Sequence, residues 1–331
     1  MKEINIALAS DENYAPHMAT NMVSICINNP HLFIRFHIAD GGISESGKDR
    51  IRDIQSKYLN CQIFFYDISD KYIKSRFACG QLFQDRSLSA YSRLFLPEFI
   101  DDSIDRLIYL DADGIVVGSL EELITISMGN IVAGVLDTIS VADRISVGLK
   151  PTDNYICSGM LLIDLSRWRG QDITNRLVEF VEKYNGQIKA MDQGAINGYF
   201  KGNIDIIHPK FNCMTLFYRH SSTHLAKLGA WEKYYDDNLI KEAIENPVFI
   251  HFTPAYTARP WQKHCTHPEK ERYLFYRQLS GFRMDSLEAD NRNSVSKILS
   301  ILYHILPFDF FMAFVNTLKR LKTKFSSASG V

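Results

Sequence analysis

The strongest constraint on this chain is a series of short apolar segments that alternate with amphipathic ones. The apolar segments lie at residues 5–10, 34–40, 62–68, 106–110, 131–137, 159–165, 204–209 and 247–252. Between them, residues 44–58, 166–185 and 236–245 have the periodicity of amphipathic helices. Strands that are apolar along their whole length are typical of parallel sheets covered on both faces. We therefore predict an α/β fold with a doubly wound, mostly parallel sheet.

Composition limits the classes of function. The 331 residues, 46% of them hydrophobic, can bury a large core, and the net charge of -1 argues against nucleic acid as a partner. The six cysteines lack CxxC spacing, and the N-terminus MKEINIALAS has too short an apolar run for a signal peptide. These features fit a reducing cytoplasm. The sequence turns polar near residue 285, where we place a domain boundary.

The segment 106–120, RLIYLDADGIVVGSL, runs from five mostly apolar residues directly into Asp111 and Asp113. Ligands of open parallel sheets bind beyond the carboxyl ends of the strands. In extended backbone both carboxylates would face one ligand, while Ala112 would point toward the core. Two carboxylates suit Mg²⁺ or Mn²⁺ with a phosphate completing the coordination. For this motif alone, a pair of solvated turn aspartates is an equally good interpretation.

The stretch DADGIV also resembles the DxDG motif of haloacid dehalogenase-type phosphatases, in which the first Asp is a nucleophile and the second a general acid. In those enzymes the motif usually closes the first strand and Thr follows it. Here several strands precede the motif, and Ile115 follows Gly114. The phosphatase is therefore an alternative that ranks below the function favoured by the other motifs.

Six further segments follow one another in a characteristic order. They are ALASDENYAPHMATNMVSI, IRFHIADGGISE, AYSRLFLPEFI, YICSGMLLIDLSRWR, MDQGAIN and HFTPAYTARPW. With YLDADGIVVGSL, this set resembles the family 8 glycosyltransferases of the GT-A fold over residues 3–280, with bacterial lipopolysaccharide and lipooligosaccharide galactosyl- and glucosyltransferases as the nearest likeness. The resemblance implies a GT-A catalytic domain at residues 1–285 that uses a UDP-hexose.

The resemblance also implies functions for individual residues. Asp11 would accept the uracil N3–H, the Tyr14 ring would stack on the base, and Ala9 would leave room for the nucleoside. The metal ligands would be Asp111, Asp113 and His251, and the imidazole favours Mn²⁺ over Mg²⁺. The full donor-binding set would be Ala9, Asp11, Asn13, Tyr14, Arg93, Asp111, Ala112, Asp113, Asp137, Cys157, Ser158 and Arg259.

Two regions depart from the family's pattern. Cys157 stands in the ICSG turn where relatives usually have Asn, so one contact to the donor sugar should be weaker or come from Ser158. After His251, Pro254 replaces a glycine and the loop is two residues longer than in the closest subgroup. The family's diphosphate-binding lysine is replaced there by arginine, and the two candidates for this contact are Arg259 and Lys263.

The family likeness further implies retention of the anomeric configuration. A double displacement needs a nucleophile close to the anomeric carbon. In MDQGAIN the amide of Gln193 is a poor nucleophile, and the resemblance directs Asp192 toward the donor hydroxyls and Arg93. We therefore expect a same-face substitution in which Gln193 and Asp192 stabilise positive charge on the sugar ring.

Residues 286–331 form a C-terminal extension. Its apolar residues 298–315 are interrupted by His304, Pro307 and Asp309, which disfavours a helix that spans a membrane. A basic cluster follows, composed of Lys319, Arg320, Lys322 and Lys324. We predict an amphipathic, basic tail whose short helices lie on an anionic inner leaflet. The alternative is a helical hairpin packed on the catalytic domain.

Together these features predict a Mn²⁺-dependent retaining hexosyltransferase, with Mg²⁺ as the alternative ion. Its partners would be UDP-galactose or UDP-glucose, a lipopolysaccharide, capsule or related glycan or glycolipid acceptor, and an anionic membrane surface. We expect a bacterial cytoplasmic protein held peripherally at the inner face of the plasma membrane. A non-catalytic nucleotide-sugar binder is a further alternative, because Cys157 could have cost the chain its turnover.

Overall fold

A computed structural model describes residues 1–78, 88–232, 234–254, 256–283, 286–315 and 317–318. Within this part of the chain, the main sheet has seven strands in the order β3-β2-β1-β4-β7-β6-β8. A small second sheet has the order β5-β10-β9. The strands are β1 (Lys2–Ser10), β2 (Leu32–Asp40), β3 (Cys61–Asp67), β4 (Arg106–Leu110), β5 (Gly114–Val116), β6 (Val132–Leu136), β7 (Ile156–Asp164), β8 (Asp205–Ile206), β9 (Cys213–Met214) and β10 (Phe249–His251).

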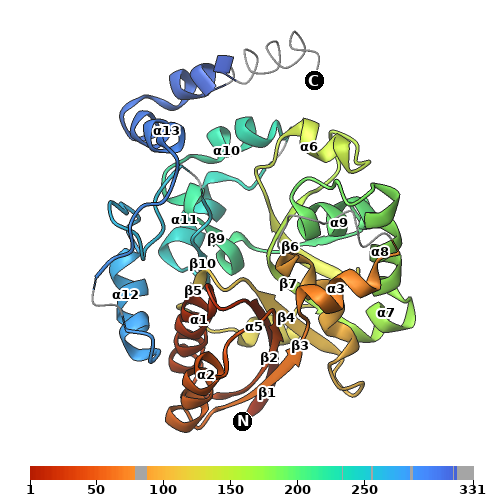
Figure 1. Cartoon of the computed structure of the whole chain (residues 1–331). Coiled ribbons are helices and arrows are strands. Elements are labelled where there is room, and N and C mark those ends of the chain that lie inside the picture. Colours follow the sequence, from red (N-terminus) through yellow and green to blue (C-terminus); the bar gives the residue numbers. More distant parts are fainter. Residues whose placement is uncertain (79–87, 233, 255, 284–285, 316, 319–331) are drawn as a thin grey trace.

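The helices surround the two sheets (Figure 1). Helices α1 and α12 pack against each other at one end of the fold, and α7, α8 and α9 pack together at the other. The helices are α1 (Ala15–Asn28), α2 (Glu45–Lys57), α3 (Asp70–Arg76), α4 (Ser92–Phe95), α5 (Glu121–Thr125), α6 (Val141–Ser146), α7 (Leu165–Gly170), α8 (Ile173–Lys183), α9 (Met191–Phe200), α10 (Ser222–Gly229), α11 (Asp237–Glu245), α12 (Lys270–Leu279) and α13 (Ser294–Ile305).

The predicted α/β fold with a mostly parallel sheet is confirmed. β3, β2, β1 and β4 run parallel to one another, and β6 runs parallel to β8. β7 lies antiparallel to both of its neighbours, β4 and β6. Because its direction is reversed, the start of β7 lies beside the carboxyl end of β4. This reversal brings Cys157 and Ser158 to the same edge of the sheet as Asp111.

Three predicted elements differ in the structure. The apolar segment 247–252 forms β10 in the small sheet rather than a strand of the main one. The predicted helix 166–185 is divided into α7 and α8, because Asp172 between them has a left-handed backbone with φ of 53°. In the segment 204–209, only Asp205–Ile206 pairs as a strand, and a 3₁₀ turn follows at Pro209–Asn212.

Polar side chains of the buried helix α1 hold the chain between β4 and β5. Nδ2 of Asn21 donates to the backbone oxygen of Asp111 at 3.0 Å. The hydroxyl of Ser24 accepts from the backbone N–H of Val116 at 2.8 Å, and Asn28 donates to the oxygen of the same residue at 3.0 Å. Among the described strands, β5 is an edge strand that pairs only with β10, and these bonds satisfy backbone groups that the pairing leaves without a partner. Helix α1 therefore fixes the turn that carries the aspartate pair.

The C-terminal extension packs in part on the rest of the fold. In α13 and the helical residues that follow it, Tyr303, Phe311 and Val315 form a small hydrophobic cluster with Leu216 and Tyr256. The hydroxyl of Tyr303 lies 2.6 Å from Nε2 of His220. This packing agrees with the alternative in which the extension docks on the catalytic domain. Within the described residues, no helix is long and apolar enough to cross a bilayer, and the basic cluster at 319–324 lies outside them.

Candidate active site

Asp111 and Asp113 belong to the connection that leaves the main sheet after β4 and enters the small sheet at β5. Ala112 and Asp113 lie in the turn itself, which corrects the extended geometry expected for this motif. β5 pairs antiparallel with β10, and the register places His251 opposite Gly114. The imidazole therefore reaches the two carboxylates through the pairing of two three-residue strands. The sequence had suggested that a strand of the main sheet would carry it.

The three side chains form a compact set of oxygen and nitrogen ligands. Nε2 of His251 lies 3.2 Å from Oδ1 of Asp113 and 3.7 Å from Oδ2 of Asp111. One ligand atom from each residue lies within 4.8 Å of the other two. Gly159 on β7 leaves space for the cluster, because a Cβ there would lie 2.1 Å from Cε1 of His251. This donor set fits Mn²⁺, and it also accommodates Mg²⁺.

Positive charges balance the two carboxylates. Asp113 forms ion pairs with His251 and with Nη1 of Arg259, whose distance to Oδ2 is 2.5 Å. Burial alone would raise the pKa of Asp113, but the charges of Arg259 and His251 hold it below its usual value. Asp113 therefore carries its negative charge at neutral pH, which is the state that binds a cation.

Arg93 is the buried charge at the centre of the site. From α4, its Nη2 donates to Oδ1 of Asp111 at 2.8 Å, and its Nε lies 3.1 Å from Oδ2 of Asp192. Its Nη1 donates to the backbone oxygen of Ser158 at 2.7 Å. Burial alone would lower the pKa of Arg93, but the two carboxylates raise it. Arg93, which was expected in the donor-binding set, thus lies between two acidic residues.

Gln193 is held at both ends of its amide. Its Nε2 donates to Oδ2 of Asp137 at 2.8 Å, and its Oε1 accepts from the backbone N–H of Ser158 at 3.0 Å. Burial raises the pKa of Asp137 and also that of Asp192, although Arg93 opposes the latter shift. The amide oxygen of Gln193 therefore has a fixed direction beside two buried carboxyl groups.

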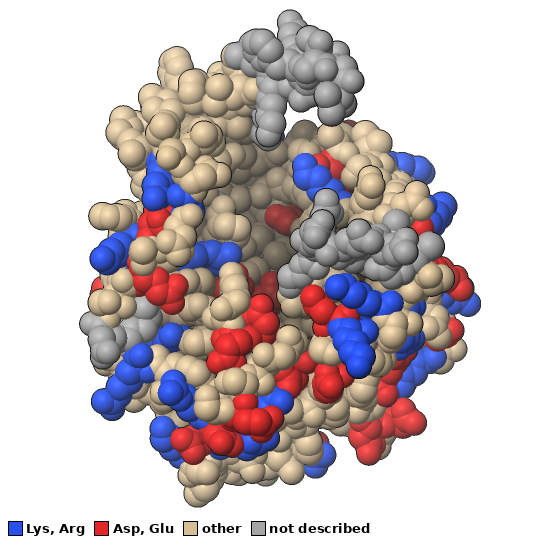
Figure 2. Space-filling view, in the orientation of Figure 1, with Lys and Arg blue, Asp and Glu red and all other residues tan. Residues whose placement is uncertain are grey.

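A cavity of about 460 Å³ opens next to the aspartate pair. Its lining includes Ala9, Asp11, Tyr14, Arg93 and both aspartates. Tyr14 is 41% exposed, so its ring is available to a ligand, while Oδ1 of Asp11 accepts from the Tyr14 N–H at 3.0 Å. Asn13 is exposed and does not line this cavity. Figure 2 shows that this face of the molecule is hollowed near its centre, with acidic atoms inside the hollow.

Two side chains lie behind His251. Oδ1 of Asn212 lies 3.0 Å from Nδ1 of His251, and Sγ of Cys157 lies 3.9 Å from the same atom. Cys157 was expected to stand where relatives contact the donor sugar, and in the structure its sulfur faces His251. Asn212 and Asn21 were both missed. A buried amide beside a strand gives no local signal of its function, although the PKFN turn before β9 marks where Asn212 stands.

These observations agree with comparisons to known proteins. Residues 5–265 match the model of glycosyl transferase family 8. General stress protein A of Bacillus subtilis is 26% identical over 82% of this chain and 92% of its own length. An Escherichia coli lipopolysaccharide 1,2-glucosyltransferase is 25% identical over 86% of this chain and 80% of its own length. The crystal structure of the galactosyltransferase LgtC with donor and acceptor sugar analogs superposes with a TM-score of 0.66, at 27% identity, over 83% of this chain and 96% of that one.

The chain belongs to glycosyltransferase family 8. Its fold is the GT-A fold of LgtC, with a helical C-terminal region. As a family 8 member it is a glycosyltransferase, and the match gives no support to the phosphatase alternative. The DADG motif follows β4, and three other strands of the main sheet precede it in the chain. The phosphatase motif, in contrast, usually closes the first strand.

Of the two candidates for the diphosphate contact, only Arg259 lies at the site. Its guanidinium contacts Asp113 and also the backbone oxygen of Phe252. Lys263 is exposed, and its described hydrogen bond is the one from its backbone N–H to Glu288. Of these two candidates, Arg259 therefore lies beside the candidate metal ligands.

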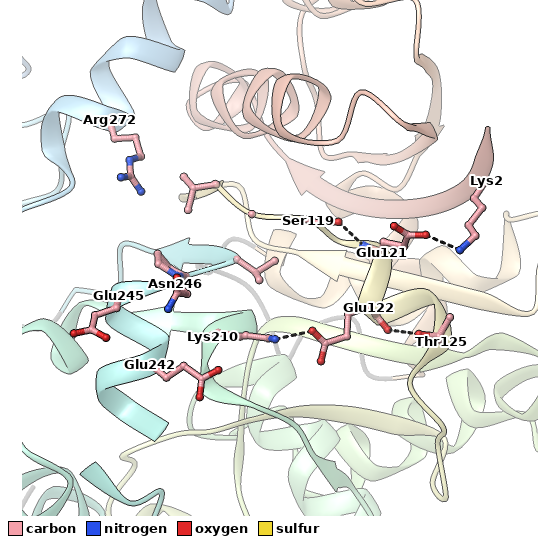
Figure 3. A pocket seen from close by; sticks show the side chains of 14 residues that line it. Lys2, Ser119, Glu121, Glu122, Thr125, Lys210, Glu242, Glu245, Asn246 and Arg272 are labelled. Atoms are coloured by element: carbon pink, nitrogen blue, oxygen red, sulfur yellow. Dashed lines mark hydrogen bonds and ion pairs between the residues drawn. The ribbon is translucent and has the colours of Figure 1, made fainter. Parts of the chain in front are cut away.

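A larger hollow of about 820 Å³ lies away from this cluster, between β5 and α11 (Figure 3). Charged side chains line it, but they pair across it. Lys2 bonds to Glu121, and Lys210 bonds to Glu122 at 2.6 Å. None of the aspartates or the histidine of the candidate active site lines this hollow. Because the cluster of Asp111, Asp113 and His251 lies beside the smaller cavity, we assign the chemistry to that cavity.

The metal site can be tested by replacing one ligand. Asp113→Asn keeps the shape of the side chain but removes a negative charge, so the dissociation constant for Mn²⁺ should rise at least about tenfold. The measurement is electron paramagnetic resonance of free Mn²⁺ during titration of the full-length protein. The matched control is Asp102→Asn, whose side chain is 97% exposed and should leave Mn²⁺ binding unchanged. Equal affinity of wild type and Asp113→Asn would remove Asp113 from the metal site.

Proposed function

We propose that this chain is a retaining hexosyltransferase that moves galactose or glucose from a UDP-sugar to a lipopolysaccharide, capsule or related glycan acceptor. The observation that carries the proposal is the cluster of Asp111, Asp113 and His251 beside a cavity lined by Asp11, Tyr14 and other polar residues. Relatives named as lipopolysaccharide glucosyl- and galactosyltransferases support this choice of donor and acceptor.

The donor's uridine fits the loop after β1. The half-exposed ring of Tyr14 offers a stacking surface for uracil, and the free oxygen of Asp11 can accept the base N3–H. Ala9 lines the same cavity without filling it. The diphosphate would lie between Arg259 and the metal ligands, where a bound Mn²⁺ or Mg²⁺ neutralises charge on the leaving UDP.

The hexose would lie beside β7 and the start of α9. Asp137, Asp192 and Ser158 offer oxygen atoms to sugar hydroxyls, whereas the sulfur of Cys157 offers a weak partner. The sulfur of Cys157 lies 3.9 Å from Nδ1 of His251, behind the proposed metal ligand. Cysteine has no side-chain amide that could bind the sugar. The contact that relatives obtain from Asn at this position would therefore be missing or come from Ser158.

Retention follows from a substitution on one face of the sugar. The bond from the anomeric carbon to the β-phosphate oxygen breaks as the bond to the acceptor oxygen forms on the same face. The acceptor proton passes to the departing phosphate oxygen. The Oε1 atom of Gln193, whose direction is fixed by Ser158 and Asp137, would stabilise positive charge on the sugar ring together with Asp192.

The proposed donor is tested with purified protein, Mn²⁺, a mixed lipooligosaccharide acceptor and a panel of UDP- and GDP-sugars. UDP-galactose or UDP-glucose should release UDP with formation of an α-linked product, and excess EDTA should stop the reaction. Asp113→Asn is the inactive control. Binding of a UDP-sugar without release of UDP would favour the non-catalytic alternative. A GDP-sugar as the only substrate, or a β-linked product by NMR, would contradict the proposal.

Gln193 offers a test of the mechanism. Gln193→Ala removes the oriented amide oxygen but no proton-transfer group, so kcat should fall about 10²-fold without disappearing. Gln187→Ala, an exposed glutamine outside the site, is the matched control and should keep normal activity. Mass spectrometry of the intact protein during turnover should find no attached hexose. A hexose covalently bound to Asp192 or Gln193 would replace this mechanism with a double displacement.

We further propose that the C-terminal extension holds the enzyme at the inner face of the cytoplasmic membrane. One side of α13 packs on the catalytic domain through Tyr303, while its other side is apolar and exposed. The exposed apolar residues of α13 and its continuation are Val295, Ile298, Ile301, Ile305, Phe310, Phe314 and Leu318. Figure 2 shows this part of the surface as nearly free of charge. An apolar face followed by the basic sequence at 319–324 suits an anionic leaflet.

The membrane proposal is tested on vesicles. Ile301 and Ile305 are 58% and 71% exposed, so Ile301→Ser with Ile305→Ser should weaken pelleting with phosphatidylglycerol vesicles about tenfold and leave the fold intact. Neutral phosphatidylcholine vesicles should bind less protein, because the basic cluster is not engaged. Leu59→Ser removes a leucine elsewhere that is 87% exposed and serves as control. Undiminished pelleting of the double variant would contradict a membrane role for α13.

A further inference from the structure

His251 presents its two ring nitrogens to different partners. Nε2 faces Asp113 and Asp111, at 3.2 and 3.7 Å. Nδ1 faces the opposite side, where Oδ1 of Asn212 lies at 3.0 Å. The ring occupies the space that Gly159 leaves open, since a Cβ there would lie 2.1 Å from Cε1 of His251. One nitrogen is thus turned to the candidate metal site and the other to a buried amide.

The small sheet sets this arrangement. Asn212 ends the 3₁₀ turn Pro209–Asn212 and immediately precedes β9. β9 runs parallel to β10, with His251 in register with Met214 and Ile250 with Cys213. The side chain that precedes β9 is therefore carried to the ring of the histidine that ends β10. Its position does not depend on any flexible segment of the described chain.

We infer that Asn212 is a positioning residue that fixes the tautomer and the orientation of His251 for metal binding. A neutral imidazole carries one N–H, and a nitrogen that binds a metal must have a free lone pair. An acceptor at Nδ1 keeps the hydrogen there, so Nε2 is left free to face the cation. This assignment rests on the metal site of the proposed function and adds a residue that neither the family likeness nor the DxD motif indicated.

The bonding of Asn212 argues against a purely structural function. Its side chain is completely buried, yet its Nδ2 atom has no hydrogen-bond partner among the described residues. A buried amide with an unsatisfied N–H group destabilises the folded chain, and leucine of similar size would avoid this penalty. The described hydrogen bond of the amide is the one that its oxygen accepts from Nδ1 of His251. Stability alone therefore gives no reason for asparagine at this position.

The test measures metal binding without a donor sugar, so it does not depend on turnover. Mn²⁺ is titrated into full-length wild type, Asn212→Leu and Asn212→Asp, and pulsed electron paramagnetic resonance records the ¹⁴N coupling of bound imidazole. Asn212→Leu removes the acceptor and should raise the dissociation constant 10- to 100-fold while weakening the ¹⁴N coupling. Asn212→Asp keeps an acceptor at the same place and should bind Mn²⁺ at least as tightly as wild type.

The matched control is Asn29→Leu. Asn29 is also completely buried, and its side chain bonds to the backbone of Ile25 and Leu120. It lies at the C-terminal end of α1, away from the site. This variant should lower the melting temperature but leave Mn²⁺ affinity and the ¹⁴N coupling unchanged. Wild-type affinity and coupling in Asn212→Leu, or a loss in Asn212→Asp as large as that in Asn212→Leu, would overturn the inference.

A measurement on unmutated protein covers the case in which Asn212→Leu does not fold. Long-range ¹H–¹⁵N spectra of Mg²⁺-loaded wild type, assigned with His251→Gln, should show a proton on Nδ1 of His251 and none on Nε2. A proton on Nε2 would overturn the inference. If wild type binds neither Mn²⁺ nor Mg²⁺, the metal site of the proposed function fails and the function of Asn212 fails with it. If wild type binds Mn²⁺ and Asn212→Leu binds it equally, only the function of Asn212 fails.

Discussion

The arrangement of the candidate site depends on one buried guanidinium. Arg93 lies between Asp111 and Asp192, whose carboxylates would otherwise repel each other. It also donates to the backbone of Ser158 and lies over the ring of Tyr109 at 4.2 Å. Breaking a buried ion pair by removing one partner typically costs about 3–5 kcal/mol, because the remaining charge is uncompensated. Arg93 therefore ties β4, β7 and α9 together at the edge where the donor would bind.

A second constraint is that two sheets of different size meet at the aspartate pair. The main sheet supplies Asp111 at the end of β4 and Ser158 near the start of the reversed strand β7. The small sheet supplies His251, and its pairing also places Asn212. Gly159 allows the two sheets to approach, since any side chain there would meet the histidine ring and the carboxylate of Asp111. The candidate metal ligands thus come from both sheets, and the position of each depends on backbone pairing rather than on long side chains.

The sequence predicted the features that local patterns encode. Wholly apolar segments marked the strands of the main sheet, and an apolar run that ends in DADG marked the candidate metal site. Segment 247–252 was predicted as a strand, but the small sheet that it joins was not. Pairing between β5 and β10 joins three residues to three others more than 130 positions away and leaves no periodic signal. His251 was recognised through the family likeness, and Asn212 was not recognised at all. Asp172 divides a predicted helix through its left-handed backbone, which hydrophobic periodicity cannot reveal.

The hydrogen bonds around Gln193 bear on how this enzyme would choose its sugar. Oδ2 of Asp137 accepts from Gln193, and Oδ1 accepts from the backbone N–H of Thr138 at 2.6 Å. Both carboxylate oxygens of Asp137 already accept a hydrogen bond. A sugar hydroxyl could donate only to a remaining lone pair on one of them, so the direction of that lone pair would decide which hydroxyls fit. Cys157 cannot replace the asparagine amide of relatives as a strong partner. Galactose and glucose differ at one hydroxyl. Discrimination between them would therefore depend on hydrogen-bond acceptors such as the Asp137 carboxylate, whose orientation Gln193 helps to fix.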